Sequence, residues 1–212
     1  MKPLLCVVDL EATCWPDHKA PGPGGQGWVE PRTEIIEIGA AIVDLPGLSA
    51  RGEFDMFVRP KLNPTLTEFC KTLTSIRQED VDTAPPFPAV IEKFAAWIAT
   101  LGPKEDVLFG SWGLYDKNQL LRDGELHDAP FPFDGEHINI KNHVAARLGR
   151  RPKGVGRTLA ALGMSFEGTP HRGIDDVRNI LRILRKVGLG EIAPNDTAAS
   201  ARHQAGLRSG SP

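Results

Sequence analysis

Cysteine is scarce in this chain of 212 residues, and the few cysteines present do not form a disulfide pattern. There are three, an odd number, and no two of them form a Cys-x-x-Cys pair. Secreted disulfide-rich domains carry even, closely spaced sets of cysteines, whereas proteins of reducing compartments keep their thiols free. We therefore expect a cytoplasmic protein without a disulfide framework.

Long apolar runs are also missing. A helix that spans a bilayer needs about 20 consecutive apolar residues, and the sequence has no such segment. A short apolar segment near the start is interrupted at once by acidic residues, so we expect no signal peptide. With 41% apolar and 25% charged residues, the composition is that of a globular domain. These absences favour a soluble protein with no membrane partner.

The formal net charge is only −2, but the two signs are unevenly distributed along the chain. Residues 141–188 hold 11 Lys and Arg against three Asp and Glu, whereas residues 1–140 hold 12 against 22. A basic segment of this kind either binds phosphate groups or forms the solvated face of helices. Charge alone favours the solvated face.

The apolar pattern predicts an α/β fold. Three early strands form an antiparallel meander, and later strands alternate with helices, which predicts a mixed sheet flanked by helices. The expected strands are 4–10, 34–45, 53–60 and 106–112. The expected helices are 65–73, 88–101, 116–123, 138–149 (following a strand end), 156–164 and 175–187.

Two segments are expected to lie outside this regular structure. Residues 16–32 are rich in Pro and Gly, which is typical of a loop. The last residues are mainly Ala, Ser, Gly and Pro with isolated charges, which is typical of disorder. We expect one domain over residues 1–188 and a disordered tail over 189–212.

Two acidic residues, Asp9 and Glu11, interrupt the first apolar strand. Residues two apart in a strand point to the same face, so both carboxylates lie on one side of the sheet. Burial and mutual repulsion make this arrangement unfavourable unless positive charge compensates it. The alternative is an edge strand with one solvated face.

Two further acids occur where strands lead into helices, and all four can converge. Asp116 follows the strand 106–112, and Asp176 begins the last helix. Carboxylate oxygens are the ligands that Mg²⁺ and Mn²⁺ prefer. Two such ions about 3.5–4 Å apart stabilise the attacking and leaving oxygens of a phosphoryl displacement. A pair of divalent ions would explain why Asp9 and Glu11 share a face.

His171 lies five residues before Asp176, in a segment that contains Pro170 and Gly173. A histidine there can remove a proton from an attacking water, because its pKa lies near neutral pH. Taken by itself, a single histidine is more often an incidental surface or hydrogen-bonded residue.

Taken together, these residues resemble the DEDDh 3′–5′ exonucleases of the ribonuclease-H-like superfamily, and most closely the Eri1-like and KapD-type members. The similarity extends over about residues 4–187. It rests on the order of the four acids and the histidine, and on the stretches VVDLEATCW, EIIEIGAAIVD, FVRPKLNPTLTEFCKTLTSIRQEDV, GSWGLYDKNQL and LAALGMSFEGTPHRGIDDVRNI.

The resemblance implies a role for each matching residue. Asp9, Glu11, Asp116 and Asp176 match the acids that bind two Mg²⁺ or Mn²⁺ ions, and His171 matches the general base. It also implies residues that hold the 3′-terminal nucleotide and its base. These substrate-binding matches are Ala12, Thr13, Leu73, Thr74, Ile76 and Trp112.

Three positions near the motifs need comment. The family spacing selects Asp176 and not its neighbour Asp175, which we interpret as a solvated acid in the first turn of a helix. Ser75 stands where the family usually has glycine. Leu114 stands where relatives often carry an additional acid that is not a metal ligand.

Two further groups of residues are candidates for contact with nucleic acid. Trp15 and Trp28 flank the loop 16–32 and either border the substrate groove or anchor the loop. Several cations around the predicted helix 156–164 are candidates for contact with upstream phosphates. They are Arg150, Arg151, Lys153 and Arg157.

The sequence therefore predicts a metal-dependent exonuclease that shortens single-stranded RNA or DNA, with RNA favoured, from the 3′ end and releases nucleoside 5′-monophosphates. One alternative is a catalytically inactive nucleic-acid-binding module of the same fold, which would bind RNA without cleaving it. Another is a hydrolase that uses paired carboxylates without metal, such as a glycosidase, whose activity would survive a chelator.

Overall fold

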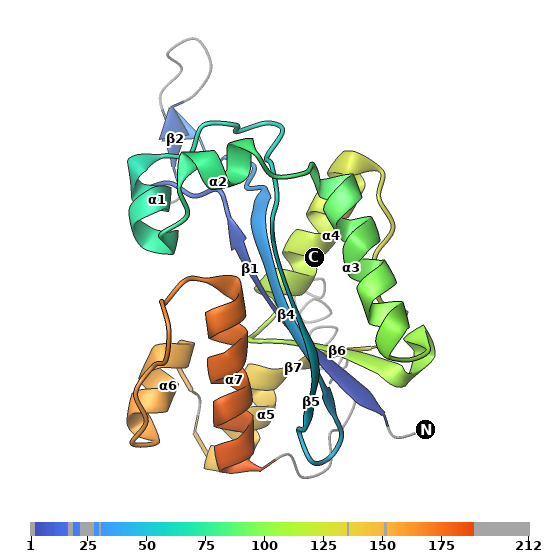
Figure 1. The fold of residues 1–212 in the computed structure, drawn as a ribbon. Helices are drawn as coiled ribbons and strands as arrows, with labels where there is room; N and C mark the ends of the chain where they lie inside the picture. The colour runs from blue at the N-terminus through green and yellow to red at the C-terminus, as the bar shows by residue number, and fades with distance from the viewer. Residues whose placement is uncertain are drawn as a thin grey trace, which may run out of the picture.

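A five-stranded mixed sheet forms the centre of the molecule (Figure 1). The computed structural model describes residues 3–16, 19–21, 28–29, 31–134, 136–150 and 152–188. The tail expected at 189–212 lies outside these residues, so the division into domain and tail stays a prediction.

The order of the strands in the sheet is β5-β4-β1-β6-β7. Their bounds are β1 Leu4–Ala12, β4 Ile35–Asp44, β5 Ala50–Phe57, β6 Val107–Ser111 and β7 His137–Asn139. β1 pairs antiparallel with β4 and parallel with β6, while β4 and β5 are antiparallel and β6 and β7 parallel. The predicted meander and mixed sheet are confirmed, although β5 begins and ends earlier than the expected segment 53–60.

The helices also follow the prediction, with one addition. Their bounds are α1 Glu68–Thr74, α2 Gln78–Asp82, α3 Phe87–Leu101, α4 Tyr115–His127, α5 Ile140–Leu148, α6 Val155–Ala161 and α7 Gly173–Val187. The short helix α2 was not predicted. Within the expected loop 16–32, two short strands, β2 (Ala20–Pro21) and β3 (Trp28–Val29), pair antiparallel. Among the described helices, none has the length and apolar character needed to cross a bilayer.

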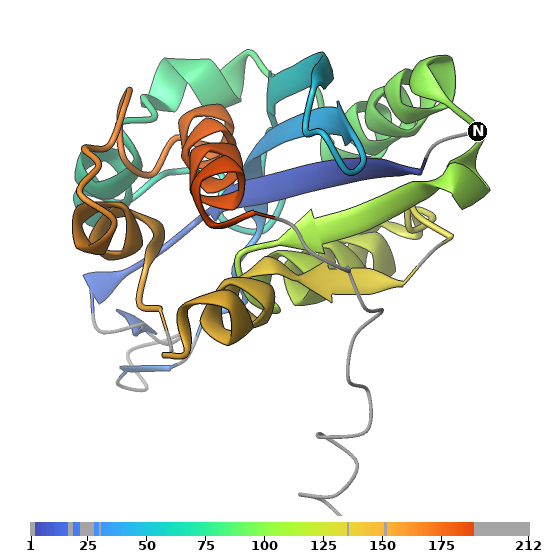
Figure 2. The ribbon, with the colours of Figure 1, turned by 90° about the horizontal axis from the view of Figure 1, so that it is seen from below.

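Helices cover both faces of the sheet, with α3 and α4 on one face and α5, α6 and α7 on the other (Figure 1, Figure 2). Even-numbered residues of β1 pack into the apolar cluster beneath α3. The odd-numbered Leu5 and Val7 pack into the cluster beneath α7. Because side chains alternate along a strand, Asp9 and Glu11 continue this odd series on the α7 face.

The first turn of α7 lies directly on the backbone of β4 and β1. A methyl group on Gly39 of β4 would lie 2.1 Å from the carbonyl carbon of Gly173, and one on Gly173 would lie 2.8 Å from the backbone oxygen of Asp9. The buried carboxylate of Glu37 accepts the backbone N–H of Gly173 at 2.9 Å and forms an ion pair with Arg172 at 2.8 Å. The helix therefore begins at a fixed distance from β1.

We expect Gly39→Ala to destabilise the protein, because the added methyl group would overlap backbone atoms that cannot move without shifting α7. The expected loss in free energy of unfolding is about 1–3 kcal/mol or more, measured by urea denaturation.

Gly156→Ala is the matched control, since a methyl group there meets no atom within 4 Å. In the helix α6 it should be neutral or stabilise by up to about 1 kcal/mol. Equal stability of the two variants would contradict the close packing of α7 on β4.

Candidate active site

β1 extends beyond its pairing with β6, and the acidic residues lie on this extension. The parallel pairing ends at Val7 opposite Gly110. Beyond this point, the backbone N–H of Leu10 donates to Oδ1 of Asp116 at 3.1 Å instead of to a strand. Asp116 is in the first turn of α4, so this bond ties the start of α4 to the end of β1.

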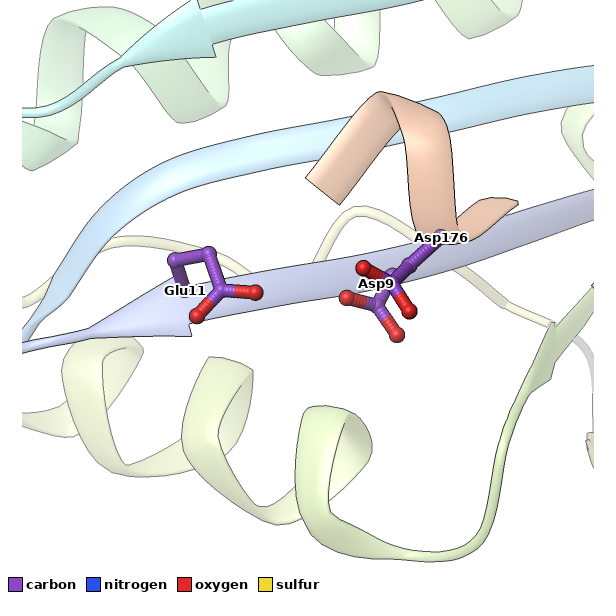
Figure 3. A group of neighbouring side chains, drawn as sticks. All are labelled: Asp9, Glu11 and Asp176. Carbon is purple, nitrogen blue, oxygen red and sulfur yellow. The ribbon is translucent and has the colours of Figure 1, made fainter. Parts of the chain in front are cut away.

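Three carboxylates meet on the α7 face of this extension (Figure 3). One oxygen from each of Asp9, Glu11 and Asp176 lies within 4.8 Å of the others. Asp9 and Glu11 project from the same side of β1, and Asp176 reaches them from α7 (Figure 3). The close approach of Gly173 to Asp9 sets this distance, because Asp176 is in the first turn of the same helix.

Asp116 is buried and lies in the same cavity, although it is not part of the group of three. Its charge raises the pKa of both Asp9 and Glu11, which places it within electrostatic reach of them. The four acids that the sequence singled out are therefore brought together from β1, α4 and α7.

His171 lies at the edge of the same cavity, just before α7. Its backbone is in the left-handed region with φ of 60°, and its N–H donates to Oδ2 of Asp176 at 2.8 Å. His171 is an exposed residue, so solvent can reach its imidazole ring.

Burial and mutual repulsion raise the pKa of all four carboxyl groups. Burial is the largest cause for each of them. The pKa of Glu11 rises to about 9 and those of Asp116 and Asp176 to about 6, while that of Asp9 also lies well above its ordinary value. The N–H of His171 opposes the shift at Asp176, and the N–H of Leu10 opposes it at Asp116.

This donor set suits hard divalent cations. Every ligand group is a carboxylate, and Mg²⁺, Mn²⁺ and Ca²⁺ are bound through such oxygens. A divalent ion would also remove the electrostatic cost that the raised pKa values reveal. The residues present therefore fit the metal ions that the sequence implied.

The cavity has a volume of about 570 Å³ and contains most of the expected site residues. Asp9, Glu11, Asp116, Asp176 and His171 all line it. The expected substrate-binding residues that line it are Ala12, Thr13, Leu73 and Trp112.

Thr74 and Ile76 were also expected to bind substrate, but the fold places them under the surface. Both are fully buried, and neither lines the cavity. The Thr74 hydroxyl donates to the carbonyl of Cys70, and Ile76 packs with Ile36 and Val81. This geometry does not support direct substrate contact by either side chain.

Several cavity residues were not identified from the sequence. Tyr115, Thr33 and Arg122 form part of the wall, together with Pro31, Cys14 and Val155. Tyr115 could have been predicted from the sequence, because it adjoins Asp116 in the chain. Thr33 and Arg122 could not have been predicted, because they reach the cavity only after β4 and α4 have packed together.

The tryptophans and basic residues lie as follows. Trp15 lines the cavity, whereas the side chain of Trp28 lies outside the described residues. The indole N–H of Trp112 donates to the carbonyl of Lys153 at 3.0 Å, so the basic segment adjoins the cavity. Arg150, Lys153 and Arg157 are exposed, and Arg151 lies outside the described residues.

Asp175 differs from the interpretation as a solvated acid. Its side chain is only 21% exposed and forms an ion pair with Arg178 at 3.0 Å. It also accepts the backbone N–H of Thr169 at 2.9 Å. Asp175 therefore holds the segment before His171, while Asp176 alone of the two faces Asp9.

Comparison with known sequences gives consistent matches. The RNase_T family model, described as Exonuclease, matches residues 6–184. The 3′-5′ exoribonuclease 1 of Rattus norvegicus is 33% identical over 185 residues, which cover 84% of this chain and 51% of that protein. The 3′-5′ exonuclease eri1 of Schizosaccharomyces pombe is 32% identical over 208 residues, covering 86% and 67%. The chain spans about half the length of the mammalian 3′-5′ exoribonuclease 1 proteins that it matches.

A solved structure agrees with these sequences. The nuclease domain of 3′hExo, described as a DEDDh family member bound to rAMP, superposes with a TM-score of 0.76 at 31% identity. The match covers 92% of this chain and 97% of that domain. It confirms the ribonuclease-H-like fold.

Without divalent ions, we expect stability to fall as pH rises. The carboxyl groups have ordinary pKa values of 3.8 and 4.5 and folded values of about 6 to 9. In this window the folded chain holds more protons than the unfolded chain, so each rise in pH favours unfolding. The melting temperature in EDTA should therefore decrease from about pH 5 to about pH 9, and Mn²⁺ should restore it most strongly at the high end.

Glu11→Gln is the matched variant for this test, because it removes a charge and keeps the shape. It should melt at a higher temperature than the wild type in EDTA at high pH and gain less from Mn²⁺. A melting temperature that rises with pH in EDTA would show that these carboxyl groups are not strained by their neighbours.

Proposed function

This chain belongs to the DEDDh exonuclease family, in its Eri1-like branch, and on that premise we propose that it is a metal-dependent 3′–5′ exonuclease of single-stranded nucleic acid. The observation that carries the proposal is the meeting of Asp9, Glu11, Asp116, Asp176 and His171 in one cavity. We further propose RNA as the preferred substrate, nucleoside 5′-monophosphates as products and the cytoplasm as the location. The names of the relatives support RNA, and the free thiols support the location.

The four acids would hold two Mg²⁺ or Mn²⁺ ions. Such ions, when bound, polarise the scissile phosphate and stabilise the charge on the attacking and leaving oxygens. The protein contributes the fixed positions of the carboxylates: Asp9 and Glu11 on a buried strand, Asp116 held by the N–H of Leu10, and Asp176 held by the N–H of His171.

His171 would act as the general base. Its ring is exposed at the cavity edge, and its backbone is tied to Asp176, so the ring stays next to the metal ligands. It takes one proton from the attacking water as the new P–O bond forms. The bond to the 3′-oxygen of the penultimate nucleotide breaks, and the terminal nucleotide leaves with its 5′-phosphate.

The cavity walls suit a terminal nucleotide. Leu73, Trp112 and Tyr115 provide apolar and aromatic surface, and base stacking on such side chains tolerates any sequence. The exposed Lys153 and Arg157 continue from Trp112 as the path of the upstream phosphates. In this proposal, the basic segment 141–188 binds the phosphates of the substrate.

We expect His171→Ala to lower the rate about 10²- to 10⁴-fold, because a general base is lost. Asp9→Asn should reduce cleavage to the level seen in EDTA. The assay uses 5′-labelled single-stranded RNA and its DNA counterpart with Mg²⁺, Mn²⁺ or EDTA, and follows shortening from the 3′ end. The faster substrate identifies the preferred sugar.

Asp128→Asn is the matched control for Asp9→Asn. Asp128 is an exposed residue in the left-handed conformation at the end of α4, which asparagine also adopts well. Its activity should equal that of the wild type. Binding of RNA without cleavage by the wild type would support the inactive-module alternative, and activity that survives EDTA would support a metal-independent hydrolase.

We expect Lys153→Ala to weaken RNA binding at low salt and to lower the slope of log affinity against log salt concentration by about 1. Lys93→Ala, an exposed lysine on α3 across the sheet, should leave the slope unchanged. Fluorescence anisotropy with labelled RNA in EDTA measures both. Equal slopes for the two variants would remove Lys153 from the phosphate path.

A further inference from the structure

The segment that carries His171 is bound along the length of α7. We call residues 165–171 the histidine loop. Alternate residues of this loop bond to residues in the first three turns of the helix. The pairs are Ser165 with Arg182, Glu167 with Asn179, Thr169 with Asp175 and His171 with Asp176. In all four pairs a side chain of the helix bonds to the backbone of the loop.

Asn179 makes the central contact of this series. It is fully buried, and both ends of its amide are used. Its oxygen accepts the backbone N–H of Glu167 at 3.1 Å, and its NH₂ group donates to the backbone oxygens of Glu167 at 2.7 Å and Asp175 at 2.8 Å. Only an amide of this length offers a donor and an acceptor to the same residue of the loop.

Arg182 holds both Asn179 and the beginning of the loop. Its guanidinium donates to the amide oxygen of Asn179 at 2.7 Å and to the carbonyl of Ser165 at 2.8 Å. It also forms an ion pair with Glu167 at 2.7 Å. The bond to Asn179 is partly buried, whereas the side chain of Glu167 is 68% exposed, so its ion pair with Arg182 is accessible to water.

Asp175 makes the last contact of the series before the bond between Asp176 and His171 itself. Gly168 lies against its carboxylate, and a methyl group there would lie 2.4 Å from the carboxyl carbon. The N–H of Thr169 then donates to the same carboxylate. The loop is thus packed against α7 up to two residues before the histidine.

This support matters because His171 itself adopts an unfavourable backbone conformation. Its φ is 60°, in the left-handed region that costs a residue with a side chain on the order of 1 kcal/mol. A loop free to relax would leave this conformation and move the ring. The contacts along α7 oppose that movement.

We propose that Asn179 and Arg182 are positioning residues for the proposed exonuclease, and that they act on catalysis through His171 although neither lines the cavity. The inference rests on the proposed role of His171 as general base. It extends the functional part of α7 from its first turn, at Asp176, to its third.

The test compares Arg182→Ala with Arg185→Ala, in the wild type and in a His171→Ala background. Arg185 is the matched control, because it also lies near the end of α7 and donates to one backbone carbonyl, that of Leu48, away from the loop. Arg182→Ala should lower kcat about 10- to 100-fold, the effect of a displacement of about 1 Å, with KM changed less than about twofold. Arg185→Ala should leave both unchanged.

The His171→Ala background separates positioning from general damage. If Arg182 acts through His171, then adding Arg182→Ala to His171→Ala should cause no further loss of kcat. An equal loss in both backgrounds, or no loss in either, would overturn the proposal. Arg182→Lys keeps a donor for Ser165 and should recover part of kcat.

A second readout does not depend on activity and keeps the proposal testable if the wild type cleaves no nucleic acid. Hydrogen exchange of the Glu167, Thr169 and His171 amides should accelerate in Asn179→Ala and Arg182→Ala but not in Arg185→Ala. If the wild type is inactive but these exchange changes occur, the proposed function is contradicted and the contacts between the histidine loop and α7 are supported. An active wild type with unchanged exchange in Arg182→Ala would contradict the positioning role alone.

Discussion

The site depends on how closely the first turn of α7 approaches β4 and β1. Gly39 and Gly173 place backbone directly against backbone, and any side chain at either position would separate them. Glu37 completes this junction by accepting the first N–H of the helix, a group that has no partner within a helix. Asp176 follows in the same turn, so the separation of the two backbones also sets the separation of its carboxylate from Asp9.

The same junction also creates electrostatic repulsion, because it brings acidic residues close together. Four carboxylates are collected on partly apolar walls, and each keeps a raised pKa because burial and its neighbours oppose ionisation. In a protein without function this arrangement would only reduce stability. In a site for divalent cations it supplies the binding energy for the ions, since the charge of each ion relieves the repulsion that folding imposes. The same repulsion would therefore lower the stability of the protein without ions and raise its affinity for divalent ions.

Around these acids, the fold supplies the remaining groups from separate segments. α4 contributes Asp116 and the wall residues Tyr115 and Arg122, while α1 contributes Leu73. α7 contributes Asp176 and, through Asp175, Asn179 and Arg182, the contacts that hold the histidine loop. A single helix thus fixes both a proposed metal ligand and the proposed base.

The amino-acid sequence by itself predicted most of the strands and helices and indicated the four acids and the histidine as site candidates, because these depend on local periodicity and on the spacing of a motif. Alternation along β1 already placed Asp9 and Glu11 on one face, and the spacing to His171 already selected Asp176 over Asp175.

Only the tertiary structure decided which neighbouring residues reach the cavity. Thr74 and Ile76 are in the expected segment but are turned into the core, whereas Thr33 and Arg122 reach the cavity from segments that carry no motif. The sequence indicated that Asp175 is a solvated acid, whereas the fold places Thr169 of the histidine loop against its carboxylate. The physical reason is that burial and hydrogen bonding depend on which distant segments pack together, and a local pattern does not contain that information.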